Sequence, residues 1–188
     1  MPISTIGQAG LDAPISLTSP TLTTPKATTT IGVGNATPSA SGAGITFPAT
    51  QSASSDANTL DDYEEGTFTP AIFGSSTAGT GTYSRQTGTY TKIGNRVYFS
   101  IYIIWSAHTG TGDMNINGLP FTSNGSNFSP CAFRQNNLAL ATNYLLLTWI
   151  VDNTSTVALN QYPLAGGGTA GVGMDTSAEI AVSGHYFV

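Results

Sequence analysis

The sequence predicts an all-β protein: an antiparallel β-sandwich of jelly-roll type, preceded by an extended N-terminal arm. Three observations predict it. Apolar residues alternate with period two in several segments after residue 67, Gly and Asn turns separate these segments, and no helical periodicity is longer than a turn or two. Strands at a spacing of roughly ten residues with tight turns between them are typical of sandwiches and jelly rolls.

The arm is predicted over residues 1–50. The first 60 residues are one-third Ser and Thr and contain six prolines, and Phe47 is their single aromatic residue. Such a stretch buries too little apolar surface to fold alone, so a disordered tail is one interpretation. Regularly spaced apolar residues favour instead an extended segment that packs on a partner protein or intertwines with other copies. We expect this role for Ile3, Ile6, Leu11, Ile15, Leu17, Leu22, Ile31 and Val33.

Residues 51–66 form an acidic junction. Half of the ten acids lie there, namely Asp56, Asp61, Asp62, Glu64 and Glu65. The composition changes after the junction, because seven of the eight phenylalanines and both tryptophans follow it. We therefore expect a domain boundary here, with a β-sandwich knob over residues 67–188.

The first strands of the knob include a hairpin. A short strand is predicted over Thr67–Phe73. In the hairpin, Gly94 and Asn95 reverse the chain, because Gly and Asn supply the positive φ angles of tight turns. The second strand of the hairpin, Val97–Trp105, has an apolar residue at every odd position and is therefore expected to bury one face.

Further strands follow the hairpin. Asn-Gly pairs at 117–118 and 124–125 mark turns, and residues 136–142 are the only candidate for a helix. In the last strand, alternation places Ile180, Val182, Tyr186 and Val188 on one side. The remaining predicted strands are Asp113–Ile116, Pro130–Arg134, Tyr144–Val151, Thr156–Leu159 and Glu179–Val188.

Charge excludes several classes of function. Only 8% of the residues are charged, about a third of the usual fraction, and the net charge is −5. No basic stripe is present to neutralise phosphates, so we expect no nucleic-acid partner. No apolar stretch approaches the roughly 20 residues of a membrane-spanning helix, and the N-terminus lacks the basic start and apolar core of a signal peptide. We expect neither membrane insertion nor export.

The sequence gives little support for catalysis. His108 and His185 are the only histidines, neither lies in a recognisable motif, and no G-x-S-x-G elbow occurs. Cys131 has no adjacent base and is predicted to be a small core residue. The glycine-rich stretch at 166–171 formally matches G-x-G-x-x-G but opens no helix, so a loop is the better interpretation. We expect a protein that is not an enzyme and has no cofactor.

The acids of the junction allow two other interpretations. Paired carboxylates hydrolyse glycosides, but adjacent positions on a linker do not create the facing pair that the reaction needs. Calcium binding by the oxygens of residues 56–65 is the stronger of the two, although the stretch lacks the glycine and the third ligand of an EF-hand loop. Solvated acids at a domain junction are our default expectation.

Four tyrosines lie on or near the hairpin: Tyr83, Tyr90, Tyr98 and Tyr102. Tyrosine offers a flat apolar ring with a polar tip, which suits sugars and protein partners alike. A binding surface is one interpretation, and packing inside the sandwich or against a neighbouring subunit is the other. We favour the second, because tyrosines with few compensating charges are also typical of buried subunit interfaces.

Two stretches carry a resemblance to a known family. The first is GITFPATQ at 44–51 followed by SDANTLDDYEEGTFTP at 55–70, and the second is GTYTKIGNRV at 88–97. Together with GLPF at 118–121 and SGHY at 183–186, they are similar to the junction and C-terminal β-domain of tail-fibre and virion-surface proteins of tailed bacteriophages. The resemblance implies a non-enzymatic homotrimer exposed on the particle, made in the host cytoplasm.

Two roles fit this resemblance. The first is a short trimeric fibre or spike, attached to the virion by its arm and exposing the knob to a host-surface glycan or protein. The alternative is a head-decoration, or cement, protein that clamps capsomers. Only about 43 residues precede the shared junction, which favours a short knob over a long fibre. A polysaccharide depolymerase is a third and weaker possibility.

Overall fold

The structure, a computed structural model, describes residues 29–125 and 128–188 and confirms the all-β prediction. The described residues form thirteen strands and no helix, and so this part of the chain holds no helix long and apolar enough to cross a membrane. The bounds of the strands are β1 (Thr30–Gly32), β2 (Gly44–Thr46), β3 (Tyr63–Phe68), β4 (Ala71–Gly74), β5 (Gly81–Ile93), β6 (Arg96–His108), β7 (Met114–Asn117), β8 (Ser129–Pro130), β9 (Ala132–Asn136), β10 (Tyr144–Ile150), β11 (Thr156–Pro163), β12 (Ala170–Gly171) and β13 (Ala178–Phe187).

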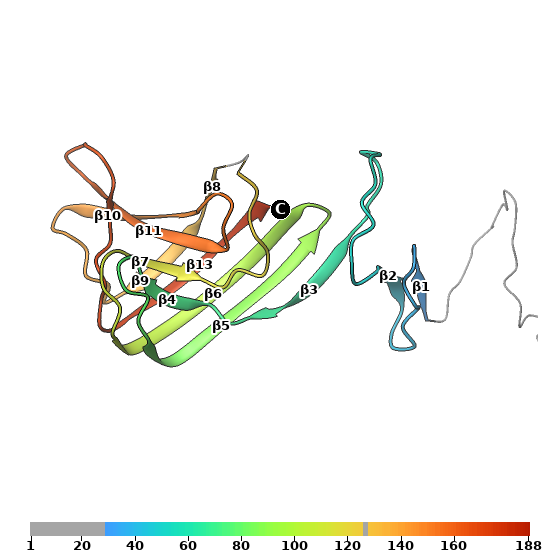
Figure 1. Cartoon of the computed structure of the whole chain (residues 1–188), viewed down its shortest axis with the longest axis horizontal. Coiled ribbons are helices and arrows are strands. Elements are labelled where there is room, and N and C mark those ends of the chain that lie inside the picture. Colours follow the sequence, from blue (N-terminus) through green and yellow to red (C-terminus); the bar gives the residue numbers. More distant parts are fainter. Residues whose placement is uncertain (1–28, 126–127) are drawn as a thin grey trace, which may run out of the picture.

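Two antiparallel sheets form a sandwich (Figure 1). The first, which we call the β6 sheet, has the order β3-β5-β6-β13-β9. The second, the β11 sheet, has the order β4-β7-β11-β10-β8, and β12 also pairs with β11. The predicted antiparallel sandwich is therefore correct, while its jelly-roll topology remains a prediction.

The core lies between the two sheets. The alternation expected along 97–105 is confirmed, because Val97, Phe99, Ile101, Ile103 and Trp105 are all buried. From β13, Ile180, Val182 and Tyr186 join the same core, and Val188 packs against it. The β11 sheet closes the core from the other side with Met114, Ile116, Leu146, Ile150, Val157 and Leu159. These side chains supply the hydrophobic stabilisation that a chain without disulfides needs.

Two of the predicted strands are each divided between the sheets. The stretch predicted as Thr67–Phe73 is β3 of the β6 sheet and β4 of the β11 sheet, and β3 begins at Tyr63. The break falls at Thr69 and Pro70, where the buried proline has no N–H to give to a ladder. The stretch predicted as Pro130–Arg134 is likewise divided at Cys131 into β8 and β9.

The predicted helix at 136–142 is wrong. Asn136 ends β9, and the residues after it are irregular. Asn137 has a φ of 61°, in the left-handed region, which ends any right-handed helix at its first turn. The stretch is therefore a connection between the sheets.

The predicted hairpin is confirmed as β5 and β6, which pair over their whole length. Its two-residue turn is Gly94-Asn95, and Gly94 has a φ of 56°. Asn95 is not among the residues of positive φ, contrary to the expectation that both turn residues would have one. A glycine of positive φ at the first turn position is the pattern of a type II′ hairpin.

The residues before the sandwich extend away from it (Figure 1). Within them, β1 and β2 form a parallel pair of three residues each, in which Ile31 lies opposite Ile45. Both isoleucines are more than half exposed, at 55% and 58%. A two-stranded unit of this size has little stability in isolation.

Candidate functional site

A row of small hydroxyl residues crosses the outer face of the β6 sheet. Strand register aligns five exposed residues across the sheet, one from each strand: Thr67, Thr89, Ser100, Ser183 and Ala132. Neighbouring strands lie about 4.8 Å apart, so the row is about 19 Å long. Thr89, Ser100 and Ser183 are on the outer face because buried residues of their strands occupy the adjacent positions, and Thr67 and Ala132 share that face through the strand register.

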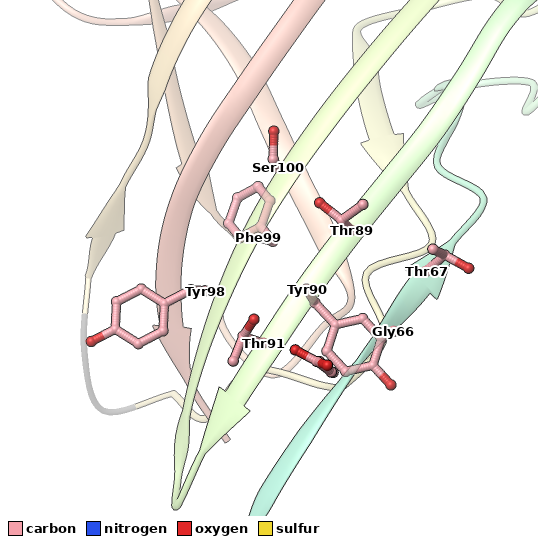
Figure 2. A pocket seen from close by; sticks show the side chains of 9 residues that line it. Gly66, Thr67, Thr89, Tyr90, Thr91, Tyr98, Phe99 and Ser100 are labelled. Carbon is pink, nitrogen blue, oxygen red and sulfur yellow. The ribbon is translucent and has the colours of Figure 1, made fainter. Parts of the chain in front are cut away.

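Two hollows lie along this row and meet at Ser100. One, of about 600 Å³, lies over β3, β5 and β6 and is shown in Figure 2. The other, of about 240 Å³, lies over β6, β9 and β13. Both are open to solvent because the side chains of the row are short. We call the two hollows together the hydroxyl groove.

Aromatic side chains from β6 stand on both sides of the groove. Tyr98 is 43% exposed and lies 5.8 Å from the His185 ring, between ring centroids. Tyr102 is four residues further along the same strand, and therefore about 13 Å from Tyr98 between Cα atoms. Tyr98 lines the larger hollow, whereas Tyr102 is half-buried and lines neither of the two.

A polar network fixes the Tyr102 side of the groove. The Tyr102 hydroxyl donates to Oε1 of Glu179 at 2.8 Å, and Arg134 forms an ion pair with the same oxygen. The Arg85 guanidinium lies 4.8 Å from the centre of the Tyr102 ring. The pKa of Glu179 is held below its ordinary value, chiefly by the hydrogen bond from Arg134 and then by that from Tyr102. The Tyr102 side chain is thus held in place by contacts within the chain.

The structure separates the four predicted tyrosines into two pairs. Tyr98 and Tyr102 are on the outer face, and their role in binding or in a subunit interface stays a prediction. Tyr83 and Tyr90 instead pack against the core inside the sandwich. The backbone N–H of Ile72 donates to the Tyr83 hydroxyl at 3.1 Å.

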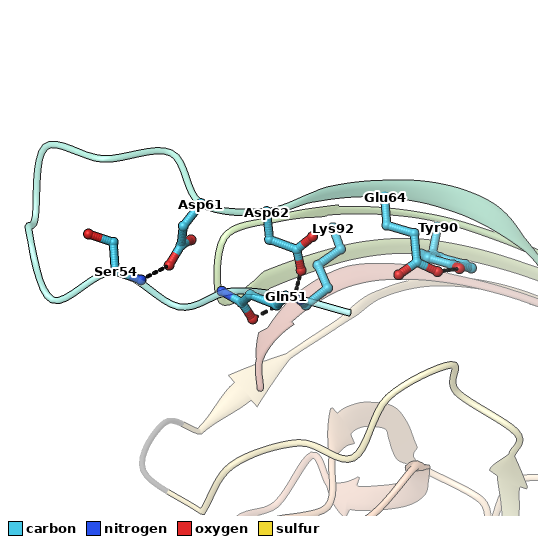
Figure 3. Close-up of polar contacts among 7 residues, drawn as sticks. All are labelled: Gln51, Ser54, Asp61, Asp62, Glu64, Tyr90 and Lys92. Atoms are coloured by element: carbon cyan, nitrogen blue, oxygen red, sulfur yellow. Dashed lines mark hydrogen bonds and ion pairs between the residues drawn. The ribbon is translucent and has the colours of Figure 1, made fainter. Parts of the chain in front are cut away.

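Polar contacts tie the acidic junction to the sandwich at the N-terminal end of β3 (Figure 3). Lys92 of β5 and Asp62 form an ion pair in which both residues are buried, at 4% and 6% exposed. The Lys92 ammonium also donates to Oε1 of Gln51 at 3.3 Å. Next to this pair, the Tyr90 hydroxyl donates to Glu64, and this hydrogen bond, with burial and the carboxylate charge, raises the pKa of Tyr90 to about 12.

The acids of the junction all have protein partners. Asp61 accepts the Ser54 N–H at 2.8 Å, which lowers the pKa of Asp61, and Asp56 accepts the Asn58 N–H at 2.9 Å. Glu65 accepts the Tyr63 hydroxyl at 3.0 Å. Within 29–125 and 128–188, no three His, Cys, Asp or Glu side chains gather where they could hold a metal ion. The absence of a calcium site remains an expectation.

The histidines and the cysteine have structural surroundings. His108 uses both ring nitrogens: Nδ1 accepts the Gly110 N–H at 2.9 Å, so Nε2 donates to the Ile72 carbonyl at 3.0 Å. His185 is exposed beside Tyr98. Cys131 packs against the core, as predicted, and burial raises its thiol pKa to about 12.

The outer face of the β11 sheet is apolar over β10, whereas its β7 part carries Asn115 and Asn117. Leu145 and Tyr162 lie opposite each other on β10 and β11 and are 55% and 37% exposed. On the same side of β10, Leu147 is 37% exposed. The Trp149 ring lies 5.8 Å from the Phe128 ring, between ring centroids, and is tilted against it by 32°. We call Leu145, Leu147, Trp149 and Tyr162 the β10 apolar face. It carries no charged side chain, in contrast to the outer face of the β6 sheet.

The fold is shared with part of a phage protein. The chain is similar to the crystal structure of the Dettilon tailspike protein (gp208), with a TM-score of 0.54 and 23% identity. The match covers 66% of this chain and 24% of the tailspike chain, so it concerns about a quarter of that protein. No protein-family model matches the sequence, and no curated protein matches it.

Sequence reasoning found only part of this site. Of the predicted arm residues, Ile31 and Val33 are exposed, and Ile3, Ile6, Leu11, Ile15, Leu17 and Leu22 lie outside the described residues. The hydroxyl row and the β10 apolar face were missed. Alternation within each strand already marked their members as outward-facing, but only the strand register aligns them.

Proposed function

We propose that this chain is a tail-associated surface protein of a tailed bacteriophage. The arm attaches it to the particle, and the sandwich contacts the host surface. The observation that carries the proposal is a compact sandwich at the end of a thin arm, with the fold of part of a tailspike. The sequence motifs of the junction support the same assignment.

The arm is suited to attachment. Three apolar residues in its described part are exposed: Ile31, Val33 and Ile45. Their exposure favours burial on other virion proteins or on other copies of the chain. Deletion of residues 1–35 is therefore expected to leave a folded sandwich that is missing from purified particles.

We further propose that the protein is a homotrimer. The β10 apolar face supports this, because subunit interfaces are apolar at their centre and depleted of charge. Leu147→Glu is expected to shift the protein from trimer to monomer in sedimentation velocity. Thr87→Glu, which introduces the same carboxylate on an exposed position of the other outer face, should leave the trimer intact. A wild-type protein that sediments as a folded monomer would contradict this part of the proposal.

We expect the protein to bind cells without cleaving their polysaccharide. The test is to incubate fluorescent protein with cells of the phage's host and to measure saturable binding and competition with phage adsorption. Reducing sugar is measured in the same samples. Saturable binding that slows adsorption, without release of sugar, supports the proposal, whereas release of sugar would establish the depolymerase instead.

A head-decoration protein is the second candidate. Its support is the same exposed apolar arm, which could lie along a shell of capsid protein. The two candidates predict different copy numbers in the particle, hundreds for decoration of the head and tens or fewer for the tail.

A further inference from the structure

We infer that residues 51–62 of the acidic junction form a closed loop that opens while the sandwich stays folded, and that opening lengthens the arm. Lys92 and Asp61 close this loop, because their contacts join parts of the chain on either side of it. The loop lies between the part that attaches the protein and the part that contacts the host. Its opening therefore adds a conformational step to the proposed function and does not depend on it.

Lys92 holds both ends of the loop. Its ammonium donates to Oε1 of Gln51 at 3.3 Å and forms the buried ion pair with Asp62 (Figure 3). The Gly94 N–H also donates to the Asp62 carbonyl at 2.9 Å, so the second end is fixed to the hairpin turn as well. The two ends of the loop thus meet at a single side chain of the sandwich.

Within the loop, Asp61 joins the two limbs. Its Oδ2 accepts the Ser54 N–H at 2.8 Å, across the loop (Figure 3). Asp56 accepts the Asn58 N–H at 2.9 Å, only two residues further on, and so forms a local turn. The two carboxylates therefore differ in what they hold: Asp61 closes the loop, whereas Asp56 acts within one limb.

Polar contacts hold the loop, and burial contributes little. Residues 51–60 are all exposed, and even Leu60 is 55% exposed. The sandwich, by contrast, is held by a continuous hydrophobic core. Segments with few buried apolar contacts open at a free energy well below that of global unfolding. We therefore expect the loop to open first, beginning at the exposed Gln51 and leaving Asp62 in its buried ion pair.

Opening changes the reach of the arm. In the closed loop, Gln51 and Asp62 contact the same ammonium, so the residues between them add almost nothing to the length of the arm. An extended chain spans at most about 3.3 to 3.6 Å per residue, so the open loop adds up to about 40 Å. The junction then changes from a fixed coupling into a flexible tether.

The test measures cleavage of the full-length protein by thermolysin at the Thr59–Leu60 bond, with the fragment that begins at Leu60 quantified by mass spectrometry. Each rate is divided by that of a free junction peptide carrying the same substitution, so that the ratio reports the open population. Gln51→Leu and Asp61→Ala each remove one closing contact. Asp56→Ala removes the same charge from the same loop without a contact between the limbs, and is the matched control.

We expect the wild-type protein to be cut about tenfold or more slowly than the peptide, while its sandwich stays uncut. Gln51→Leu and Asp61→Ala should each speed cleavage about threefold or more, and Asp56→Ala should change it less than about twofold. Wild-type cleavage as fast as that of the peptide, cleavage only when the sandwich unfolds, or equal effects of Asp61→Ala and Asp56→Ala would overturn the inference. None of these outcomes bears on binding to host cells, so the proposed function stands or falls by its own test.

Discussion

Lys92 and Asp62 form a buried ion pair at the point where the arm enters the sandwich. Both side chains are nearly inaccessible, and the Lys92 ammonium also lies 5.6 Å from the centre of the Phe121 ring. Removing one partner leaves the other charge buried without compensation, and this is far more costly than losing an exposed pair. The stability of the junction therefore depends on these two residues more than on the other acids around them.

Lys92→Met is expected to lower the free energy of unfolding by about 3 to 5 kcal/mol. The measurement is urea denaturation at a fixed protein concentration. Arg134→Gln provides the comparison, because it breaks an ion pair whose arginine side chain is 63% exposed. Exposed pairs contribute about 0 to 1 kcal/mol. Equal losses in the two variants would contradict the buried position of Lys92.

Gly88 leaves room for the Phe68 ring from the neighbouring strand. A Cβ at position 88 would lie 2.6 Å from that ring, closer than any real contact. Gly88→Ala is therefore expected to destabilise the protein by about 1 to 3 kcal/mol, through displacement of the ring. Gly168→Ala, where a Cβ meets nothing within 4 Å, should be close to neutral by thermal denaturation. A neutral Gly88→Ala would contradict the packing of Phe68.

The Tyr90 hydroxyl links stability to alkaline pH. Its pKa is raised from 10.0 to about 12, chiefly because it donates to Glu64. Since the folded state holds this proton more tightly than the unfolded state, the contribution of the hydroxyl is complete below about pH 10 and is lost as the pH rises through 12. Tyrosine absorbance during an alkaline titration should show a late phase that Tyr90→Phe reduces. An unchanged late phase would contradict the hydrogen bond to Glu64.

At the scale of the elements, period-two alternation predicted the strands well but not the sheet to which each belongs. The alternation of β6 from Val97 to Trp105 is as predicted, because one face of that strand meets the core at every second residue. By contrast, β3 and β4 are continuous in pattern but lie in different sheets. A strand that crosses from one sheet to the other at Pro70 keeps its alternation, so the local pattern does not reveal the crossing.

The same limit applies to the candidate site. Tyr98 and Tyr102 were found from the sequence because tyrosine is conspicuous among outward positions. The Ser and Thr residues of the row were not, because exposed Ser and Thr residues also occur at other positions of β5 and β6. Their alignment depends on the register of pairs such as Thr67 with Thr89 and Ser183 with Ser100, which no single strand encodes.

At the scale of the whole molecule, the two outer faces of the sandwich differ in chemistry. The β6 sheet presents hydroxyls, tyrosines and the arginines of its strands, whereas the β10 apolar face has no charge. The low charge of the chain, 8% of its residues, is thus distributed unequally between the two faces. The described part of the arm extends away from the sandwich at the junction end (Figure 1).

We propose that the protein belongs to the tail of a phage particle. The most direct test is quantitative mass spectrometry of purified particles, in which the copies of this chain are counted against those of the major capsid protein. We predict a few copies to a few tens per particle. Hundreds of copies would instead place the protein on the head, and its absence from particles would contradict the account.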